Sequence, residues 1–298
     1  MKERILSLTI YGLSTGLGIA AFIYPFFLPA LQREAMMGQG HASDAPLLLT
    51  GLVGVCFVAM LLEVQSQATG AKMVALIGVL VSMNAILRFA EVAIPGPGGF
   101  SPIFFLIVLT GYVYGSGFGF LMGSLTLLVS ALITAGIGPW LPYQMFTAGW
   151  VGMSAPLCRP VVRLLGGRGQ WAEVVVLAAF GGLWALAFGG IITLWFWPFT
   201  VGPASQHWQP GSGLLDTARR FIAFYLATSL VWDLMRLVGN VMLVLAFGLP
   251  TLRALRRFHR RFSFTYDKGA GVSGQPSALG SHAISGQRPA LHPAGDVP

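Results

Sequence analysis

The sequence predicts an all-α membrane protein, a helical bundle of about eight transmembrane helices. Of its 298 residues, 55% are hydrophobic and only 9% are charged, and the mean hydropathy is +0.73. A soluble protein of this size carries far more charged side chains on its surface. The apolar residues fall in long unbroken runs, which favours helices over the short alternating strands of a membrane barrel. Composition and hydropathy pattern together indicate helices that cross a bilayer.

Residues 99–153 contain the most informative pattern. Two apolar runs without a charge lie on either side of the turn at 115–117. Each run is predicted to be long enough to cross a bilayer, and the short turn makes the two helices antiparallel neighbours. The corner that follows, residues 138–142, combines two prolines with an interfacial tryptophan, Trp140. Glycines recur every four residues along the hairpin, a spacing that lets helix backbones approach closely in lipid: they are Gly111, Gly115, Gly119 and Gly123.

Two further helices are predicted at the N-terminus, in residues 1–64. The first, 1–31, is too long for the core of a signal peptide and lacks a clear cleavage site, so we expect it to stay. The second covers 46–62. Their role is open between a structural appendage and a part in choosing partners.

The helix predicted over 71–94 carries polar side chains on one face. Asn84, Arg88 and Glu91 are spaced by four and three residues and so share that face. At its start, Ala71 and Ala75 form an A-x-x-x-A pattern whose small side chains leave room for a neighbouring helix. That neighbour is either a partner protein or another helix of the same chain.

Three more spans complete the predicted bundle. They cover 143–165, 171–199 and 216–249, and the last is about 50 Å long, so it must tilt or protrude from a core about 30 Å thick. An arginine-rich run follows, and the tail 262–298 is rich in Gly, Ser, Ala and Pro and is predicted to be disordered.

The basic residues predict the orientation. The net charge is +8, but the positive side chains fall between the apolar runs and after the last one, which argues against nucleic-acid binding. With Met1 on the inside, most of them collect on the inner side. Both termini are therefore expected in the cytoplasm, and the corner at 138–142 is expected on the outer face with the loops 95–101 and 200–214.

The charges within predicted spans include Arg88, Glu91, Asp233 and Arg236. Facing lipid, they would together cost on the order of 10 kcal/mol, so they must face the bundle interior. They either pair with one another as a structural clasp or line a polar ligand cavity with Asn84 and Asn240. Five side chains either cap such a cavity or anchor the protein at the membrane interface: Trp140, Tyr143, Gln144, Trp195 and Trp208.

Several enzymatic motifs are missing from the sequence. None of the three lysines belongs to a P-loop, and all five histidines lie outside the predicted spans. Cys56 and Cys158 are expected at different depths, as packing residues without a disulfide. The sequence gives no reason to expect a cofactor or a metal.

The segments F-S-P at 100–102, GYVYGSGFGFLMGSLTLLVSAL and GPWLPYQMFTAGWVGM resemble the substrate-binding (S) subunit of energy-coupling factor (ECF) vitamin transporters. The resemblance covers about 71–261. It implies a six-helix core that captures a vitamin from outside, and partners that comprise a transmembrane scaffold subunit and two ATPase subunits. It also implies that Ala71 and Ala75 contact the scaffold. The W-D-x-x-R-x-x-G-N pattern at 232–240 is similar to the cobalamin or corrinoid branch, and riboflavin or another flat heterocycle ranks second.

Two other classes of function stay open. One is a stand-alone membrane enzyme that acts on lipids or isoprenoids through the four intramembrane charges. The other is a purely structural partner protein that binds no ligand.

Overall fold

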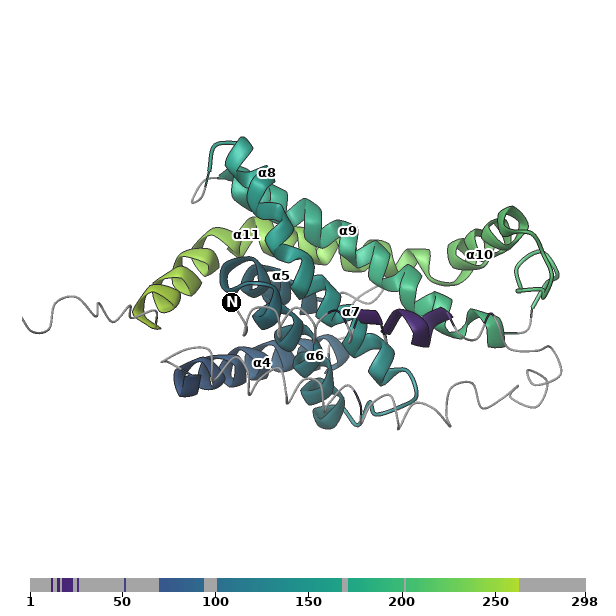
Figure 1. Cartoon of the computed structure of the whole chain (residues 1–298), viewed down its shortest axis with the longest axis horizontal. Coiled ribbons are helices and arrows are strands. Elements are labelled where there is room, and N and C mark those ends of the chain that lie inside the picture. The colour runs from purple at the N-terminus through teal and green to yellow at the C-terminus, as the bar shows by residue number, and fades with distance from the viewer. Residues whose placement is uncertain are drawn as a thin grey trace, which may run out of the picture. The chain divides into compact units, whose positions relative to one another are not determined.

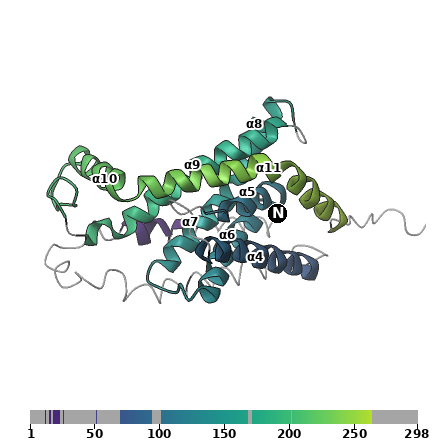
Figure 2. The same ribbon diagram turned by 180° about the vertical axis from the view of Figure 1, so that it is seen from behind.

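The computed structural model describes residues 70–93, 101–167, 171–200 and 202–262, with 12, 15, 16, 18–23, 26 and 51. Within these ranges every regular element from residue 70 onward is a helix (Figures 1 and 2), which confirms the predicted all-α class. The α-helices are α4 (Gly70–Ala93), α5 (Ile103–Tyr114), α6 (Ser116–Ile133), α7 (Leu141–Ser154), α8 (Cys158–Leu164), α9 (Trp171–Phe196), α10 (Leu214–Thr228) and α11 (Leu230–Phe262), with short 3₁₀ turns at Ala155–Leu157 and Trp197–Phe199.

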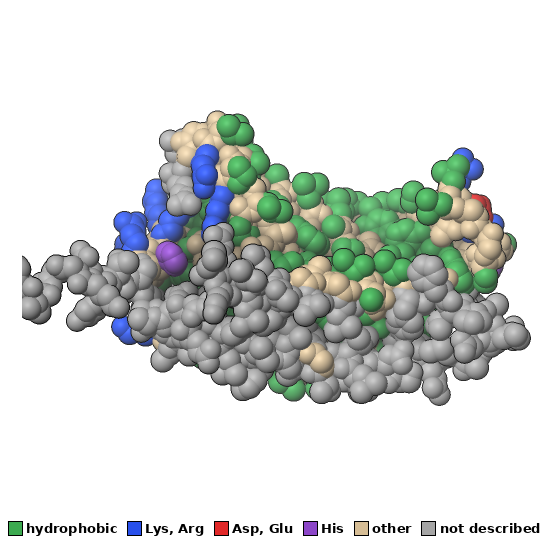
Figure 3. Space-filling view, viewed as in Figure 1, with side chains coloured by type: hydrophobic (Ala, Val, Ile, Leu, Met, Phe, Trp, Pro, Cys, Tyr) green, Lys and Arg blue, Asp and Glu red, His purple; other side chains and the backbone are tan. Residues whose placement is uncertain are grey.

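Among the described residues, four helices have the length and apolar composition to cross a membrane. These candidate spans are Lys72–Phe89, Ser116–Ile133, Trp171–Phe199 and Leu230–Arg260. Their outward side chains are apolar: Ile86 of α4, Leu183 of α9 and Met242 of α11 are all more than half exposed. On the described part of the face in Figure 3, hydrophobic side chains predominate between the two ends of the bundle, as expected for a surface in contact with lipid.

Helix α5 forms the centre of the bundle. Every residue from Ile103 to Tyr112 is buried, because α4, α6, α7, α9 and α11 all contact this helix. A helix that is apolar on all sides is typical of one that is surrounded by protein or by lipid. Its 12 residues rise about 18 Å, so the prediction that this run is long enough to cross the bilayer is wrong. Pro102 precedes its first turn and Gly115, at φ 112°, ends it.

Three of the four predicted glycines lie at close helix contacts, with α7 and, for Gly119, also with Gly111 of α5, whereas a Cβ on Gly115 would meet no atom within 4 Å. A Cβ atom on Gly111 or Gly119 would overlap the backbone of Gly152 in α7, and one on Gly123 would overlap the backbone of Ala148. Conversely, a Cβ on Gly152 would overlap the Gly119 carbonyl. The three helices α5, α6 and α7 therefore meet backbone to backbone, and we call Gly111, Gly119, Gly123 and Gly152 the glycine seam.

Helices α9 and α11 lie side by side in antiparallel orientation. Gly189 and Gly182 of α9 lie against Asp233 and Leu237 of α11, and Val174 near the start of α9 lies against Gly248. The small residues of α9 give α11 a flat surface to pack on.

The last predicted span, 216–249, is wrong in two ways. The helix breaks at Ser229 into α10 and α11, because Ser229 has φ −121° and its hydroxyl hydrogen-bonds to the Thr193 hydroxyl of α9, at 2.8 Å between oxygens. Helix α10 has no buried residue and mixes charged with apolar side chains, which is typical of a helix in the membrane interface. Helix α11 then continues through Pro250 to Phe262 and changes direction toward that end (Figure 2), as a proline within a helix allows.

The predicted span 143–165 is also interrupted. Helix α7 ends at Ser154, and a 3₁₀ turn leads into α8. Pro156 has no N–H to donate to the Gly152 carbonyl, so the regular α-helical pattern stops there. Cys158 is buried, as a packing residue would be.

Most of the predicted N-terminal helices and the predicted disordered tail, from 263 on, lie outside the described residues. Residues 18–23 are helical, and Phe22 is buried against α7. The Phe22 ring lies 5.1 Å from the Tyr143 ring, edge to face. The first segment of the chain therefore contacts the central helices directly.

Candidate functional site

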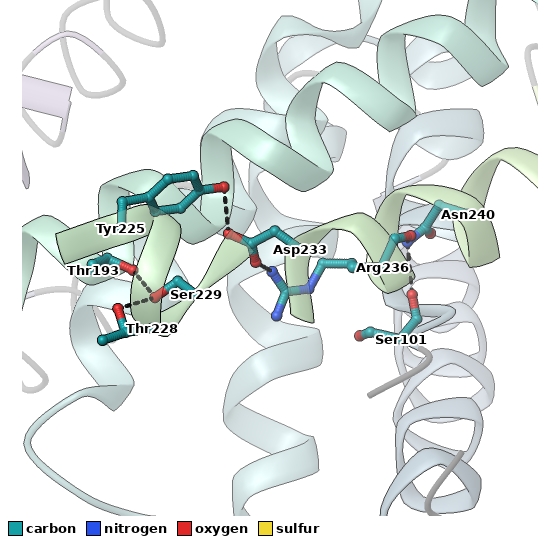
Figure 4. Close-up of polar contacts among 8 residues, drawn as sticks. All are labelled: Ser101, Thr193, Tyr225, Thr228, Ser229, Asp233, Arg236 and Asn240. Carbon is teal, nitrogen blue, oxygen red and sulfur yellow. Dashed lines mark hydrogen bonds and ion pairs between the residues drawn. The ribbon is translucent and has the colours of Figure 1, made fainter. Parts of the chain in front are cut away.

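A buried ion pair lies where α9, α10 and α11 meet (Figure 4). The Asp233 side chain is 3% exposed; one oxygen pairs with Arg236 one turn later, and the other accepts a 2.8 Å hydrogen bond from the Tyr225 hydroxyl of α10. The guanidinium of Arg236 lies 5.4 Å from the centre of the Phe188 ring in α9. Two of the predicted intramembrane charges therefore neutralise each other inside the protein, as expected for charges kept away from lipid. We call Tyr225, Asp233 and Arg236 the polar centre.

Helix α9 makes room for this pair with a glycine. A Cβ on Gly189 would overlap the Asp233 carboxylate, so the carboxylate lies directly on the α9 backbone. Three hydroxyls lie near this carboxylate at the helix break (Figure 4). The Ser229 hydroxyl hydrogen-bonds to the hydroxyls of Thr193 and Thr228. The break between α10 and α11 thus brings together a carboxylate, a guanidinium and several hydroxyl groups.

Two asparagines hold the start of α5. Asn240 of α11 donates its amide N–H to the Ser101 carbonyl at 2.7 Å, and Asn84 of α4 donates to the Ile103 carbonyl at 2.9 Å. Asn84 also lies 3.4 Å from the Thr126 hydroxyl of α6. The two side chains are 1% and 0% exposed, and their amide oxygens have no hydrogen-bond partner among the described residues. Buried acceptors without a partner favour binding of a donor group, since leaving them unpaired costs about 1–3 kcal/mol each.

Three of the four predicted aromatic residues fall into two contact groups. Tyr143 is fully buried between Phe22 and Trp195, with the Trp195 ring 5.4 Å away. Trp208 contacts Phe26 at 5.8 Å, and Trp140 is 41% exposed at the start of α7. Phe26 also contacts Trp197, whose indole N–H donates to the Gln206 carbonyl at 2.8 Å. The aromatic residues therefore surround the ends of α7 and α9 rather than lie around one point.

The remaining predicted site residues belong to α4 and α7, not to the helices that supply the polar centre. Arg88 of α4 and Gln144 of α7 are half-buried. Glu91 belongs to α4, but its side chain lies outside the described residues, as does that of Ala71. Ala75 is exposed and lines an apolar groove of about 740 Å³ between α4 and α11.

Sequence reasoning missed several polar side chains of the bundle. Tyr225 completes the polar centre, and the chain offered only its position eight residues before Asp233 as a signal. Glu173 is fully buried, accepts a 2.7 Å hydrogen bond from Tyr112 and pairs with Arg256. Its signal was stronger, because it is the only charged residue of α9 and the run after Pro250 is rich in arginine.

Outside the candidate spans, one further ion pair fixes the start of α10. The Arg220 guanidinium donates to the Asp216 carboxylate at 2.7 Å and to the Ala204 carbonyl. The hydrogen bond from Arg220 holds the pKa of Asp216 below its ordinary value. Arg220 therefore ties the loop before α10 to the helix.

Comparison with known families gives one match. The model of the family described as "ECF transporter, substrate-specific component" matches residues 72–248, more than half of the chain. A search of curated proteins and a search of solved structures each gave no match. The matched range begins in α4 and ends in α11, so it includes the central helices and the polar centre. The chain therefore belongs to the family of substrate-specific components of ECF transporters.

Proposed function

We infer that this protein is a transport subunit rather than an enzyme, as members of its family are. They bind the substrate in the membrane and work with a scaffold subunit and ATPase subunits. The described bundle, with four apolar helices of membrane length, agrees with such a role.

We propose that this protein captures a cobalamin or related corrinoid from outside the cell for ATP-driven uptake by its partner subunits. Riboflavin or another flat heterocyclic vitamin is the second choice. The observation that supports a substrate site here is that Asp233 and Arg236 of the polar centre and Asn240 lie on successive turns at the start of α11. The polar residues of the W-D-x-x-R-x-x-G-N pattern turn inward, with Asp233 and Asn240 buried, whereas Trp232 is 55% exposed.

The charge distribution supports an outward-facing site. Arginines of α8 and of the C-terminal part of α11 gather at one end of the bundle (Figure 3), which the positive-inside rule assigns to the cytoplasm. Asp233 precedes Arg253 by 20 residues in α11, or about 30 Å of helix, the thickness of the hydrocarbon core. The polar centre then lies toward the outer face, and both termini lie in the cytoplasm of a cell-membrane protein.

The vitamin is identified by equilibrium binding of the purified chain to a panel of labelled vitamins. We expect a corrinoid to bind with one molecule per chain and more tightly than riboflavin, thiamin or biotin. Tight binding of thiamin or biotin without corrinoid binding would overturn the choice of substrate.

The groove between α4 and α11 fits a helix of the scaffold subunit. Its walls are apolar, with Leu76 and Met83 on one side and Phe247 and Phe258 on the other. Ala75 is a small side chain on its surface, which leaves room for a partner backbone. A partner helix would cover apolar surface that has no cover within the described residues.

Replacing Ala75 by tryptophan should reduce vitamin uptake in cells at least tenfold while the isolated subunit keeps its affinity for the vitamin. The reason is that a large side chain would hold the scaffold helix away from the groove. Val175→Trp is the matched control, since Val175 is also exposed but lies on α9, away from the groove. Unchanged uptake by Ala75→Trp would contradict the proposed contact.

A further inference from the structure

The two walls of the groove between α4 and α11 have the same spacing of residues. On each helix, successive lining residues are separated by three, one, three, one and three positions. These residues are Lys72, Ala75, Leu76, Val79, Leu80 and Met83 on α4, and Phe247, Pro250, Thr251, Ala254, Leu255 and Phe258 on α11. Each wall is therefore about 17 Å long, or about three turns of helix.

This spacing is that of a left-handed coiled coil. Within each wall, four lining positions are separated by four, three and four residues, which is the heptad spacing of a coiled-coil seam. They are positions 72, 76, 79 and 83 on α4, and 247, 251, 254 and 258 on α11. The other two positions of each wall, such as Ala75 and Pro250, flank the seam. A seam of this kind takes up the side chains of a facing helix between its own side chains.

Helix α5 forms the floor of the groove. Leu106 of α5 lines the groove, and α4 and α11 both pack against α5. Large apolar side chains of both seams are exposed: Val79 is 58% exposed, Met83 51% and Phe247 56%. Two exposed seams along one groove indicate a third helix that packs on both at once.

The flank of the α11 seam carries a positive charge. Arg257 lies one heptad after Pro250 and directly before Phe258, and it is exposed. Charges at flanking positions of coiled coils pair with opposite charges of the facing helix. The three acidic side chains that the structure describes pair with other arginines: Glu173 with Arg256, Asp216 with Arg220, and Asp233 with Arg236. Within the described residues no carboxylate is left for Arg257, whereas a facing helix can supply one.

We infer that the groove binds one helix of the scaffold subunit as the third helix of a left-handed coiled coil. This partner helix carries apolar side chains at heptad spacing over about three turns, and a carboxylate that faces Arg257. The inference rests on the proposed function and adds the chemistry of the partner helix to it. The charge pair fixes the register of the helix along the groove, since apolar contacts alone allow it to slide by a heptad.

Charge reversal at Arg257 tests this chemistry. The labelled full chain, in nanodiscs, is titrated with the purified complex of scaffold and ATPase subunits. Arg257→Glu should raise the dissociation constant about tenfold or more, because it brings two carboxylates together, and Arg257→Lys should change it by less than about twofold. Circular dichroism checks that each variant is folded.

Arg253→Glu is the matched control. Arg253 is exposed one turn earlier on the same helix, but it belongs neither to the seam nor to its flanks. The same change of charge at this position should alter the dissociation constant by less than about twofold. If Arg257→Glu and Arg253→Glu had equal effects while Ala75→Trp still weakened binding, the facing carboxylate would be refuted and the proposed scaffold contact would stand. If Ala75→Trp had no effect either, the contact itself would be refuted.

Photo-cross-linking identifies the occupant of the groove. A benzoylphenylalanine in place of Val79 should link to the scaffold subunit, and mass spectrometry should place the link in a peptide with apolar residues at heptad spacing and an Asp or Glu. The same group in place of Val175, which is exposed on α9, should give no such link. A link from position 79 to a second copy of this chain, to its residues 1–69 or to lipid alone would overturn the inference.

Discussion

Replacing Gly152 by leucine should prevent α5, α6 and α7 from packing together. A side chain at this position would occupy the place of the Gly119 carbonyl, and backbone atoms inside a seam of three helices cannot move aside. Overpacking of a well-packed core costs about 1–3 kcal/mol and sometimes more, and here we expect at least about 3 kcal/mol. The measurement is thermal unfolding in detergent, with size-exclusion chromatography to detect misfolded protein.

Gly78→Leu is the control for the glycine seam. Gly78 lies within α4, and a Cβ there meets no atom within 4 Å. Its replacement should leave the melting temperature unchanged or raise it, because leucine favours helix by about 1 kcal/mol over glycine. If Gly152→Leu melted like the wild type and Gly78→Leu did not, the packing of the seam would be refuted.

Removing one partner of the polar centre should destabilise the protein by about 3–5 kcal/mol, since it leaves a buried charge without its counter-ion. In the Asp233→Leu variant the Arg236 guanidinium has lost its counter-ion, and in the Arg236→Met variant the Asp233 carboxylate has lost its counter-ion. The double variant removes both charges and should recover most of the lost stability. Unfolding of the four proteins in the cycle measures the coupling between the two side chains.

Vitamin binding by the same double variant separates the two roles of the pair. A structural clasp predicts recovery of both stability and binding, whereas a ligand site predicts recovery of stability with binding lost. We expect at least a tenfold loss of affinity, because the site would lose both charged groups. Asp216→Ala, which breaks the exposed pair with Arg220 on α10, should leave stability and binding unchanged.

The sequence was sufficient for the features that depend on local pattern. Length and hydropathy predicted α4 and α9 within a few residues, and the glycine spacing predicted a close helix contact. It predicted that Asp233 and Arg236 face inward, because charges in lipid are costly. These features follow from helix periodicity and from the properties of the bilayer.

Features that depend on tertiary contacts could not be predicted in this way. The break at Ser229 is stabilised by a hydroxyl of α9, which lies 36 residues away in the chain. The glycine seam also includes α7, whereas the sequence offered only the contact between the two helices of the hairpin. Glu173 pairs with Arg256 across 83 residues, and no local pattern connects them.

The role of a substrate-capture subunit that depends on partners is tested most directly by purifying the full chain from its native membranes in mild detergent. We expect a transmembrane scaffold subunit and two ATPase subunits to co-purify with it, and Ala75→Trp to reduce their recovery. Recovery of the chain alone, under conditions that keep other membrane complexes intact, together with turnover of a lipid substrate by that single chain, would contradict the account.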